Sequence, residues 1–173
     1  MDRLQRFFLG TGTDDRGRLL ADVLRQDDAW LEHTHDFIQW LFPLVERSGA
    51  APGAPTLDAA TIEAFARDPA LRRGLRAGLD RMLAFYGLAW QGARIGKAAD
   101  WAARERDWFT RDTHNNLRLT RMLKSLSVLG LPDEARALHA ALAGLRGEPD
   151  CGIGATAWRY WDEALGQPPR SGR

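Results

Sequence analysis

One stretch of the sequence, residues 30–44, limits the possible folds more than any other, because it is strongly aromatic yet interrupted by polar side chains. At about 100° per residue, its apolar side chains would cover more than half of a helix surface. The remaining strip would carry four polar residues, Glu32, His35, Asp36 and Gln39. Pro43 would end such a helix. We therefore predict a central helix over residues 28–44, buried on most sides and carrying one polar strip.

Composition points to one globular domain in a reducing compartment. The chain has 173 residues, 45% of them hydrophobic and 27% charged, which is enough for a sizeable core. Its net charge of +1 gives no reason to expect nucleic acid as a partner. The single cysteine, Cys151, rules out an internal disulfide. With no long apolar run and no signal peptide, the sequence predicts no transmembrane segment and a cytoplasmic location.

The rest of the chain also follows helical spacing, without runs of strand-type alternation, and this predicts an all-α bundle of six to eight helices. We expect the whole chain, residues 1–173, to form a single helical domain. Beyond the central helix, helices are expected at about residues 19–24, 58–68, 69–86, 98–109, 114–130, 132–145 and 158–165, the last two making a C-terminal part over 132–166. The segment 89–96 is expected to be irregular, and a frayed tail is expected at 167–173.

Two glycines inside the predicted 69–86 helix, Gly74 and Gly78, lie four residues apart. Each costs roughly 1 kcal/mol of helix propensity relative to alanine. A neighbouring helix that approaches closely at these positions would compensate for that cost. Gly87 stands where a glycine in the left-handed conformation is expected to end the helix.

A second polar strip is expected on the 114–130 helix. His114, Arg118 and Arg121, spaced by four and three residues, would form a cationic stripe that starts at the helix N-terminus. Free backbone N–H groups there also favour an anion such as a carboxylate, a phosphate or an acidic peptide. Alternatively, the arginines pair internally with carboxylates and lock the helices together, since buried arginine usually has such a partner. The sequence leaves both interpretations open.

Two segments, Leu31–Pro43 and His114–Leu126, together resemble the signature of the opioid growth factor receptor conserved region. The segments that link them also fit, namely Met82–Gly87, Asp100, Trp101 and Arg104. The resemblance covers roughly residues 8–131. It implies a helical domain that, in animal members, belongs to a receptor for an opioid peptide, and it brings no catalytic residues. Animal members also carry a repeat-rich extension and nuclear-targeting runs, and we expect neither here.

The sequence therefore predicts a polar seam where the 28–44 and 114–130 helices meet. Its candidate ligand-binding residues are Glu32, His35, Asp36, Gln39, Arg104, His114, Asn115, Arg118 and Arg121. By family resemblance, we expect a non-enzymatic binding domain that engages a peptide or protein partner there. Two alternatives remain open. One is a small-anion-binding protein or enzyme that uses the cluster of His35, His114, Arg118 and Arg121, and the other is a purely structural scaffold.

No motif in the sequence calls for a metal, a cofactor or a catalytic residue. Glu32-x-x-His35 is half of a di-metal helix motif, but the sequence offers no second copy. One cysteine cannot supply a Cys-rich zinc cluster. Phosphate loops, nucleophile elbows and zinc-protease motifs are all missing from the sequence. The seven tryptophans are interpreted as core residues with their N–H groups satisfied at its edge.

Overall fold

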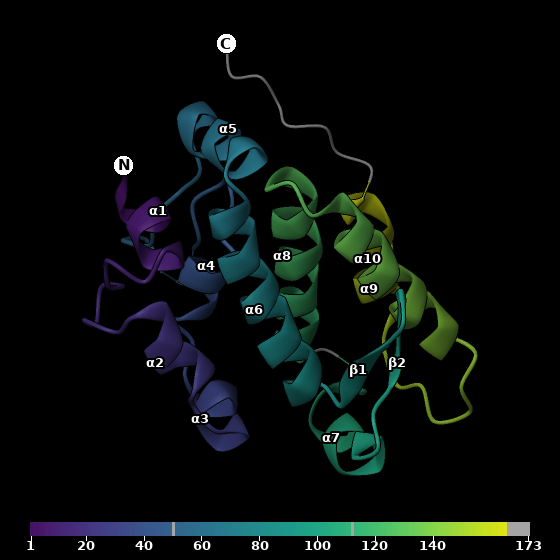
Figure 1. The fold of residues 1–173 in the computed structure, drawn as a ribbon. Helices are drawn as coiled ribbons and strands as arrows, with labels where there is room; N and C mark the ends of the chain where they lie inside the picture. Colours follow the sequence, from purple (N-terminus) through teal and green to yellow (C-terminus); the bar gives the residue numbers. More distant parts are fainter. Residues whose placement is uncertain (50, 112, 166–173) are drawn as a thin grey trace. The chain divides into compact units, whose positions relative to one another are not determined.

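The structure, a computed structural model, describes residues 1–49, 51–111 and 113–165 (Figure 1). The described residues form ten helices and one two-stranded sheet, which confirms the predicted all-α class and exceeds the predicted six to eight helices. The predicted tail, 167–173, lies outside the described residues. The chain separates into two compact units, Met1–Arg81 and Met82–Arg173, and passes from one to the other within helix α6. A single domain over the whole chain stays a prediction.

The first unit contains five short helices and the beginning of α6. These are α1 (Arg3–Phe8), α2 (Leu20–Leu24), α3 (Asp28–His33), α4 (Ile38–Leu41), α5 (Ala59–Arg67) and α6 (Pro69–Phe85). Asp2, Asp27 and Asp58 cap α1, α3 and α5, each accepting a hydrogen bond from the backbone N–H three residues later. Buried aromatic rings then join the helices, with Phe7 against Trp40 and Phe8 against Phe65.

The predicted continuous helix over residues 28–44 was wrong, because the segment forms two helices, α3 and α4, separated by residues 34–37. Thr34 has extended backbone angles, φ −100° and ψ 130°, and ends α3. The break turns the Asp36 carboxylate toward two arginines of an earlier loop. The side chains that follow, from Phe37 to Phe42, are nearly all buried. Long-range pairing therefore outweighs the helical preference of the segment.

The expected close approach at Gly74 and Gly78 is confirmed within the first unit. A Cβ atom on Gly74 would lie 2.6 Å from the backbone oxygen of Phe8 in α1. A Cβ atom on Gly78 would lie 2.7 Å from Cδ1 of Leu41 in α4. The two glycines lower the helix propensity of α6, but only a position without a side chain lets α1 and α4 pack so closely against it.

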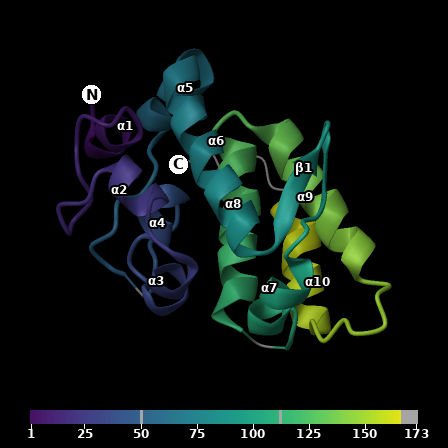
Figure 2. The same cartoon turned by 60° about the horizontal axis from the view of Figure 1, so that its bottom comes forward.

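The second unit combines the end of α6 with a hairpin and four helices (Figures 1 and 2). These elements are β1 (Leu88–Gln91), β2 (Arg94–Lys97), α7 (Trp101–Trp108), α8 (His114–Val128), α9 (Pro132–Leu145) and α10 (Ala155–Ala164). Helix α8 packs against both α9 and α10, and strand β2 lies along α9. The predicted bounds of α8 and α9 agree with the structure to within two residues.

The predicted irregular segment 89–96 was also wrong, since it forms the antiparallel hairpin β1–β2 with Trp90 opposite Ile95. Gly92 in the connecting turn has a φ of +66°, a conformation typical of glycine in tight hairpins. Strands of four residues are too short for alternation to identify them in the sequence. Gly87 has a φ of +70° and ends α6, as predicted.

The tryptophans of the second unit are mainly core residues, as predicted. Trp101, Trp108, Trp158 and Trp161 are buried, while Trp90 is half-buried. The Trp108 Nε1–H donates to the backbone oxygen of Tyr86 at 3.1 Å, and the Trp161 Nε1–H donates to that of Asn116 at 3.1 Å. The Trp158 Nε1–H likewise donates to the backbone oxygen of Ile153 at 3.2 Å, so three of the four buried indoles satisfy their polar atom inside the unit.

Candidate functional site

A cluster of arginines and aspartates surrounds the loop between α1 and α2 in the first unit. Asp14 is buried, and its Oδ1 accepts the backbone N–H groups of Arg16 and Arg18 at 2.8 and 2.9 Å. Its Oδ2 accepts from Arg18 Nε at 2.6 Å. Gly17, with a φ of +77°, allows the chain to turn back so tightly. The loop is therefore built around one buried carboxylate that holds its own backbone and Arg18 in place.

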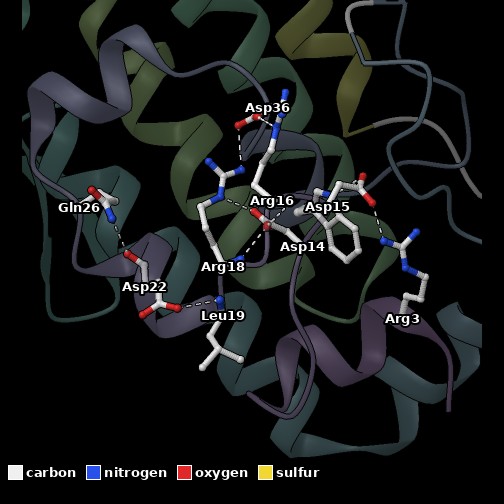
Figure 3. Close-up of polar contacts among 10 residues, drawn as sticks. Arg3, Asp14, Asp15, Arg16, Arg18, Leu19, Asp22, Gln26 and Asp36 are labelled. Carbon is white, nitrogen blue, oxygen red and sulfur yellow. Dashed lines mark hydrogen bonds and ion pairs between the residues drawn. The ribbon is translucent and has the colours of Figure 1, made fainter.

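Arg18 and Arg16 extend from this loop to Asp36 (Figure 3). Arg18 Nη2 donates to Asp36 Oδ1 at 2.8 Å, and Arg16 Nε donates to Asp36 Oδ2 at 2.9 Å. Arg18 thus lies between two carboxylates, and each carboxylate oxygen of Asp36 accepts from a different arginine. This pairing joins the loop to the break between α3 and α4. Charge-assisted hydrogen bonds of this kind are stronger than neutral ones.

The ion pairs alter the titration of the cluster. Burial alone raises the pKa of Asp36, but the hydrogen bonds and positive charges of Arg18 and Arg16 outweigh it and hold the pKa below its usual value. Burial alone lowers the pKa of Arg18, but its hydrogen bonds to Asp36 and Asp14 outweigh that effect and raise it. At neutral pH both groups carry full charges.

The lowered pKa of Asp36 predicts an acid-dependent loss of stability. The contribution of the ionised carboxylate is fully present above the unfolded-state pKa of about 4 and is lost as the pH falls through the lower folded-state pKa. Urea unfolding of the parent and Asp36→Asn proteins between neutral pH and pH 2.5 measures this. The difference in free energy of unfolding should stay constant down to about pH 4 and then shrink. A difference that does not change with pH would contradict the pairing.

Aromatic rings border the charged groups. The Arg18 guanidinium lies 5.2 Å from the ring centroid of Trp30, and that of Arg3 lies 5.0 Å from the centroid of Trp40. Asp15 pairs with Arg3 and accepts the Trp40 Nε1–H at 3.2 Å. Long arginine side chains are thereby fixed against flat surfaces, which reduces the entropy they would lose on contacting a ligand.

Several of these charged and aromatic side chains line a cleft of about 410 Å³, which we call the arginine–aspartate cleft. It is lined by Asp15, Arg16, Arg18, Asp36, Trp40 and residues 51–54. Arg16 is 71% exposed, whereas Arg18 is largely covered. The cleft therefore presents positive and negative groups side by side, with an indole in its wall.

The predicted site residues fall into both units. In the first unit, Glu32 is half-buried on α3, His35 is exposed in the break, and Asp36 belongs to the arginine–aspartate cleft. Gln39 is buried on α4, and its Oε1 has no hydrogen-bond partner within the described ranges. Asp36 is thus the one predicted residue that lines this cleft, and its pairing with the loop arginines was not anticipated.

In the second unit, Arg104 and Asp100 form an i, i+4 ion pair at 3.1 Å, and Arg104 is half-buried. Arg118 is only 4% exposed, and its Nη1 donates to Asn115 Oδ1 at 3.2 Å. His114 starts α8, and Arg121 is half-buried on the same helix. The middle residue of the predicted cationic stripe, Arg118, is therefore buried and not exposed to solvent. The predicted polar seam between the 28–44 segment and the 114–130 helix stays a prediction.

Sequence reasoning missed Asp14, Arg16 and Arg18. Residues 10–17 have the glycines and polar residues of a loop and match no nucleotide-binding motif, so no candidate residue was named there. The available signal was the run Asp14-Asp15-Arg16-Gly17-Arg18, since an aspartate in a turn often accepts the backbone N–H two residues later. The partner across the fold, Asp36, could not be read from local spacing.

In the ranges 1–49, 51–111 and 113–165, no group of three or more His, Cys, Asp or Glu side chains is placed to hold a metal ion. None of the helices in those ranges is long and apolar enough to cross a membrane.

The chain is thus a small, mainly helical protein whose first unit contains a cleft lined by ion pairs. Residues 18–142 match the family described as "Opioid growth factor receptor (OGFr) conserved region". The chain belongs to this family, in agreement with the resemblance noted in the sequence.

Known relatives carry this region within longer proteins. The chain is 37% identical over 121 residues to "Opioid growth factor receptor" of Mus musculus, covering 66% of this chain and 19% of the receptor. It is 41% identical over 120 residues to "Opioid growth factor receptor-like protein 1" of the same species, covering 66% of this chain and 25% of that protein. The human receptor is 38% identical over 104 residues, 58% of this chain and 15% of the receptor. The matched region is thus a quarter or less of these relatives. No solved structure matches the chain.

Proposed function

We propose that this chain is a non-enzymatic binding domain that engages a peptide or protein partner through the polar residues of the 28–44 segment and the 114–130 helix. In the first unit, this surface is the arginine–aspartate cleft. The relatives are named as receptors and receptor-like proteins, which supports a binding role. The observation that carries the proposal is the pairing of Asp36 with Arg16 and Arg18 at the wall of that cleft.

Such a cleft suits a peptide better than an ion of one sign. The guanidinium of Arg16 is suited to a carboxylate, because its planar N–H groups match that geometry. The carboxylates of Asp15 and Asp36 accept hydrogen bonds from ammonium or amide N–H groups. A peptide offers both kinds of group along one chain, next to side chains that can lie against Trp40. The existing ion pairs would exchange partners with the peptide instead of leaving a charge buried and unpaired.

The strip on α8, in the second unit, is proposed as a further set of residues that contact the partner. His114 and Arg121 supply donors there, and Arg104 adds another. Arg118 is buried and bonded to Asn115, so its own contribution is to hold α8 in shape. That observation favours the scaffold alternative for this one residue. The small-anion or enzyme alternative would need His35, His114, Arg118 and Arg121 to converge on one ligand.

A matched pair of arginine variants tests the cleft. Arg16 is 71% exposed and pairs with Asp36; Arg25 is 72% exposed and pairs with Asp22 in the same unit. We expect Arg16→Ala to weaken the binding of a selected peptide by about 5- to 50-fold, as is usual when a charge-assisted contact is lost. Arg25→Ala should change the affinity by less than about twofold, because Arg25 is not among the residues that line the cleft. Calorimetric titration measures both.

The ligands for this titration are selected from a library of short peptides with free termini, with opioid growth factor included. Selection uses the complete chain, and circular dichroism checks that each variant keeps the parent's helical content. Equal affinities for parent, Arg16→Ala and Arg25→Ala would refute the proposal. Inorganic phosphate is titrated in the same way. If it binds more tightly than every peptide, the small-anion alternative is favoured.

A further inference from the structure

A second hollow lies in the second unit, between the first two turns of α8 and helix α10. It has a volume of about 230 Å³, and we call it the α8–α10 pocket. Its lining residues are Thr113, Asn116, Leu117, Thr120, Thr156, Ala157 and Tyr160. All of them are uncharged at neutral pH, in contrast to the arginine–aspartate cleft. Successive helix positions 100° apart place this lining about a third of a turn away from His114, Arg118 and Arg121.

One lining residue of the α8–α10 pocket, Asn116, carries a buried acceptor without a partner among the residues that the structure describes. Asn116 is 6% exposed, and its Nδ2 donates to the Thr110 backbone oxygen at 3.3 Å. This bond fixes the orientation of the amide, because only the nitrogen can donate to a carbonyl. Asn116 Oδ1 then has no hydrogen-bond partner among the described residues. A buried polar atom without a partner costs free energy that a ligand can recover.

Thr113 adds a second polar atom at the same place. It is the N-cap residue of α8, yet its side chain makes no capping hydrogen bond within the described part of the chain. Its Oγ1 is buried and likewise lacks a partner there. A hydroxyl both donates and accepts, so it complements the acceptor on Asn116.

The rim of the pocket is unusually apolar for a surface. Across the described ranges, the exposed large hydrophobic side chains are Met1, Val45, Leu117 and Tyr160. Leu117 and Tyr160, from α8 and α10, both line this pocket. An apolar rim above a few directed polar atoms is typical of small-molecule sites.

We infer that the α8–α10 pocket binds a small uncharged molecule whose flat apolar body carries one N–H or O–H donor. The body lies between Leu117 and Tyr160, and the donor reaches Asn116 Oδ1. The neutral lining disfavours an ion, which would lose hydration without gaining a counter-charge. This site is separate from the proposed function, because it uses another face of α8 and none of the residues of the arginine–aspartate cleft.

Indole and benzofuran are the probes, because they share a shape and differ in the N–H donor. Two-dimensional NMR of the complete chain follows the Leu117 methyl, Thr156 and Tyr160 resonances during each titration. Indole should shift these resonances in a saturable way. Benzofuran should bind about two- to tenfold more weakly, the range expected for one lost hydrogen bond. No saturable shift with millimolar indole, or equal binding of both probes, would overturn the inference.

A pair of surface variants provides the control. Leu117 is 67% exposed and Val45 is 46% exposed, so serine at either position should leave the fold intact. Leu117→Ser should weaken indole binding by about threefold, in proportion to the apolar area lost from the rim. Val45→Ser, in the first unit, should leave it unchanged. The same weakening in both variants would assign the shifts to nonspecific association and overturn the inference.

Discussion

Replacing Asp14 with alanine is expected to lower the free energy of unfolding by about 3 kcal/mol, the scale of a broken buried ion pair. The Asp14 carboxylate accepts two backbone N–H groups and the Arg18 guanidinium, and its side chain is fully covered. Alanine leaves these donors without that acceptor, and among the described residues Arg18 then keeps Asp36 as its one carboxylate partner. Urea unfolding at pH 7 measures the loss.

Asp133→Ala is the control for this experiment, because Asp133 forms an ion pair with Arg136 on an exposed surface of α9. Its loss should change the free energy of unfolding by less than about 1 kcal/mol. Similar values for the two aspartate variants would mean that Asp14 does not organise its loop, and the arginine–aspartate cleft would lose its support.

Gly74→Ala is expected to destabilise the protein by about 2 kcal/mol, although alanine is the better helix former. The new Cβ would lie 2.6 Å from the Phe8 backbone oxygen and 3.2 Å from Phe8 Cδ1, so α1 or α6 must move. Phe8 is buried and in contact with Phe65, which leaves little room for such a shift. Thermal and urea unfolding measure the change.

Gly144→Ala gives the opposite sign in the same chain. Gly144 lies in α9, and a Cβ atom there meets nothing within 4 Å. Alanine should therefore stabilise the protein by about 0.5–1 kcal/mol through helix propensity alone. If Gly74→Ala also proved stabilising, the close packing of α6 against α1 would be disproved.

The sequence predicted best those helices that bury one continuous face. The predicted 69–86, 114–130 and 132–145 helices agree closely with α6, α8 and α9. Their apolar residues recur every three or four positions, and that signal is local. Among the shorter elements, α2 and α5 were also predicted, but α1 and the hairpin were missed. Helix α1 has six residues and depends on Asp2, which caps it and also accepts from Thr61 far along the chain. Neither that contact nor the β1–β2 pairing leaves a periodic pattern.

The candidate site was predicted only in part, for a related reason. Asp36 was identified because it falls on the polar strip of an aromatic segment, and Arg104 because it belongs to a segment that fits the family resemblance. The partners of Asp36 lie 18 and 20 residues earlier in a loop. Loop residues that are ordered by a buried carboxylate carry no helical or strand period, so spacing alone could not place Arg16 and Arg18 beside Asp36.

The most direct test of the binding role is an NMR titration of the complete, isotope-labelled chain with a peptide selected as above. We expect saturable shifts of the Arg16 Nε–H, the Trp40 indole N–H and the Gly53 amide, because all three residues line the arginine–aspartate cleft. The same titration of Arg16→Ala should show the shifts only at higher peptide concentration. Saturable binding that leaves the Trp40 and Gly53 signals unmoved would contradict the claim that this cleft is where the domain meets its partner.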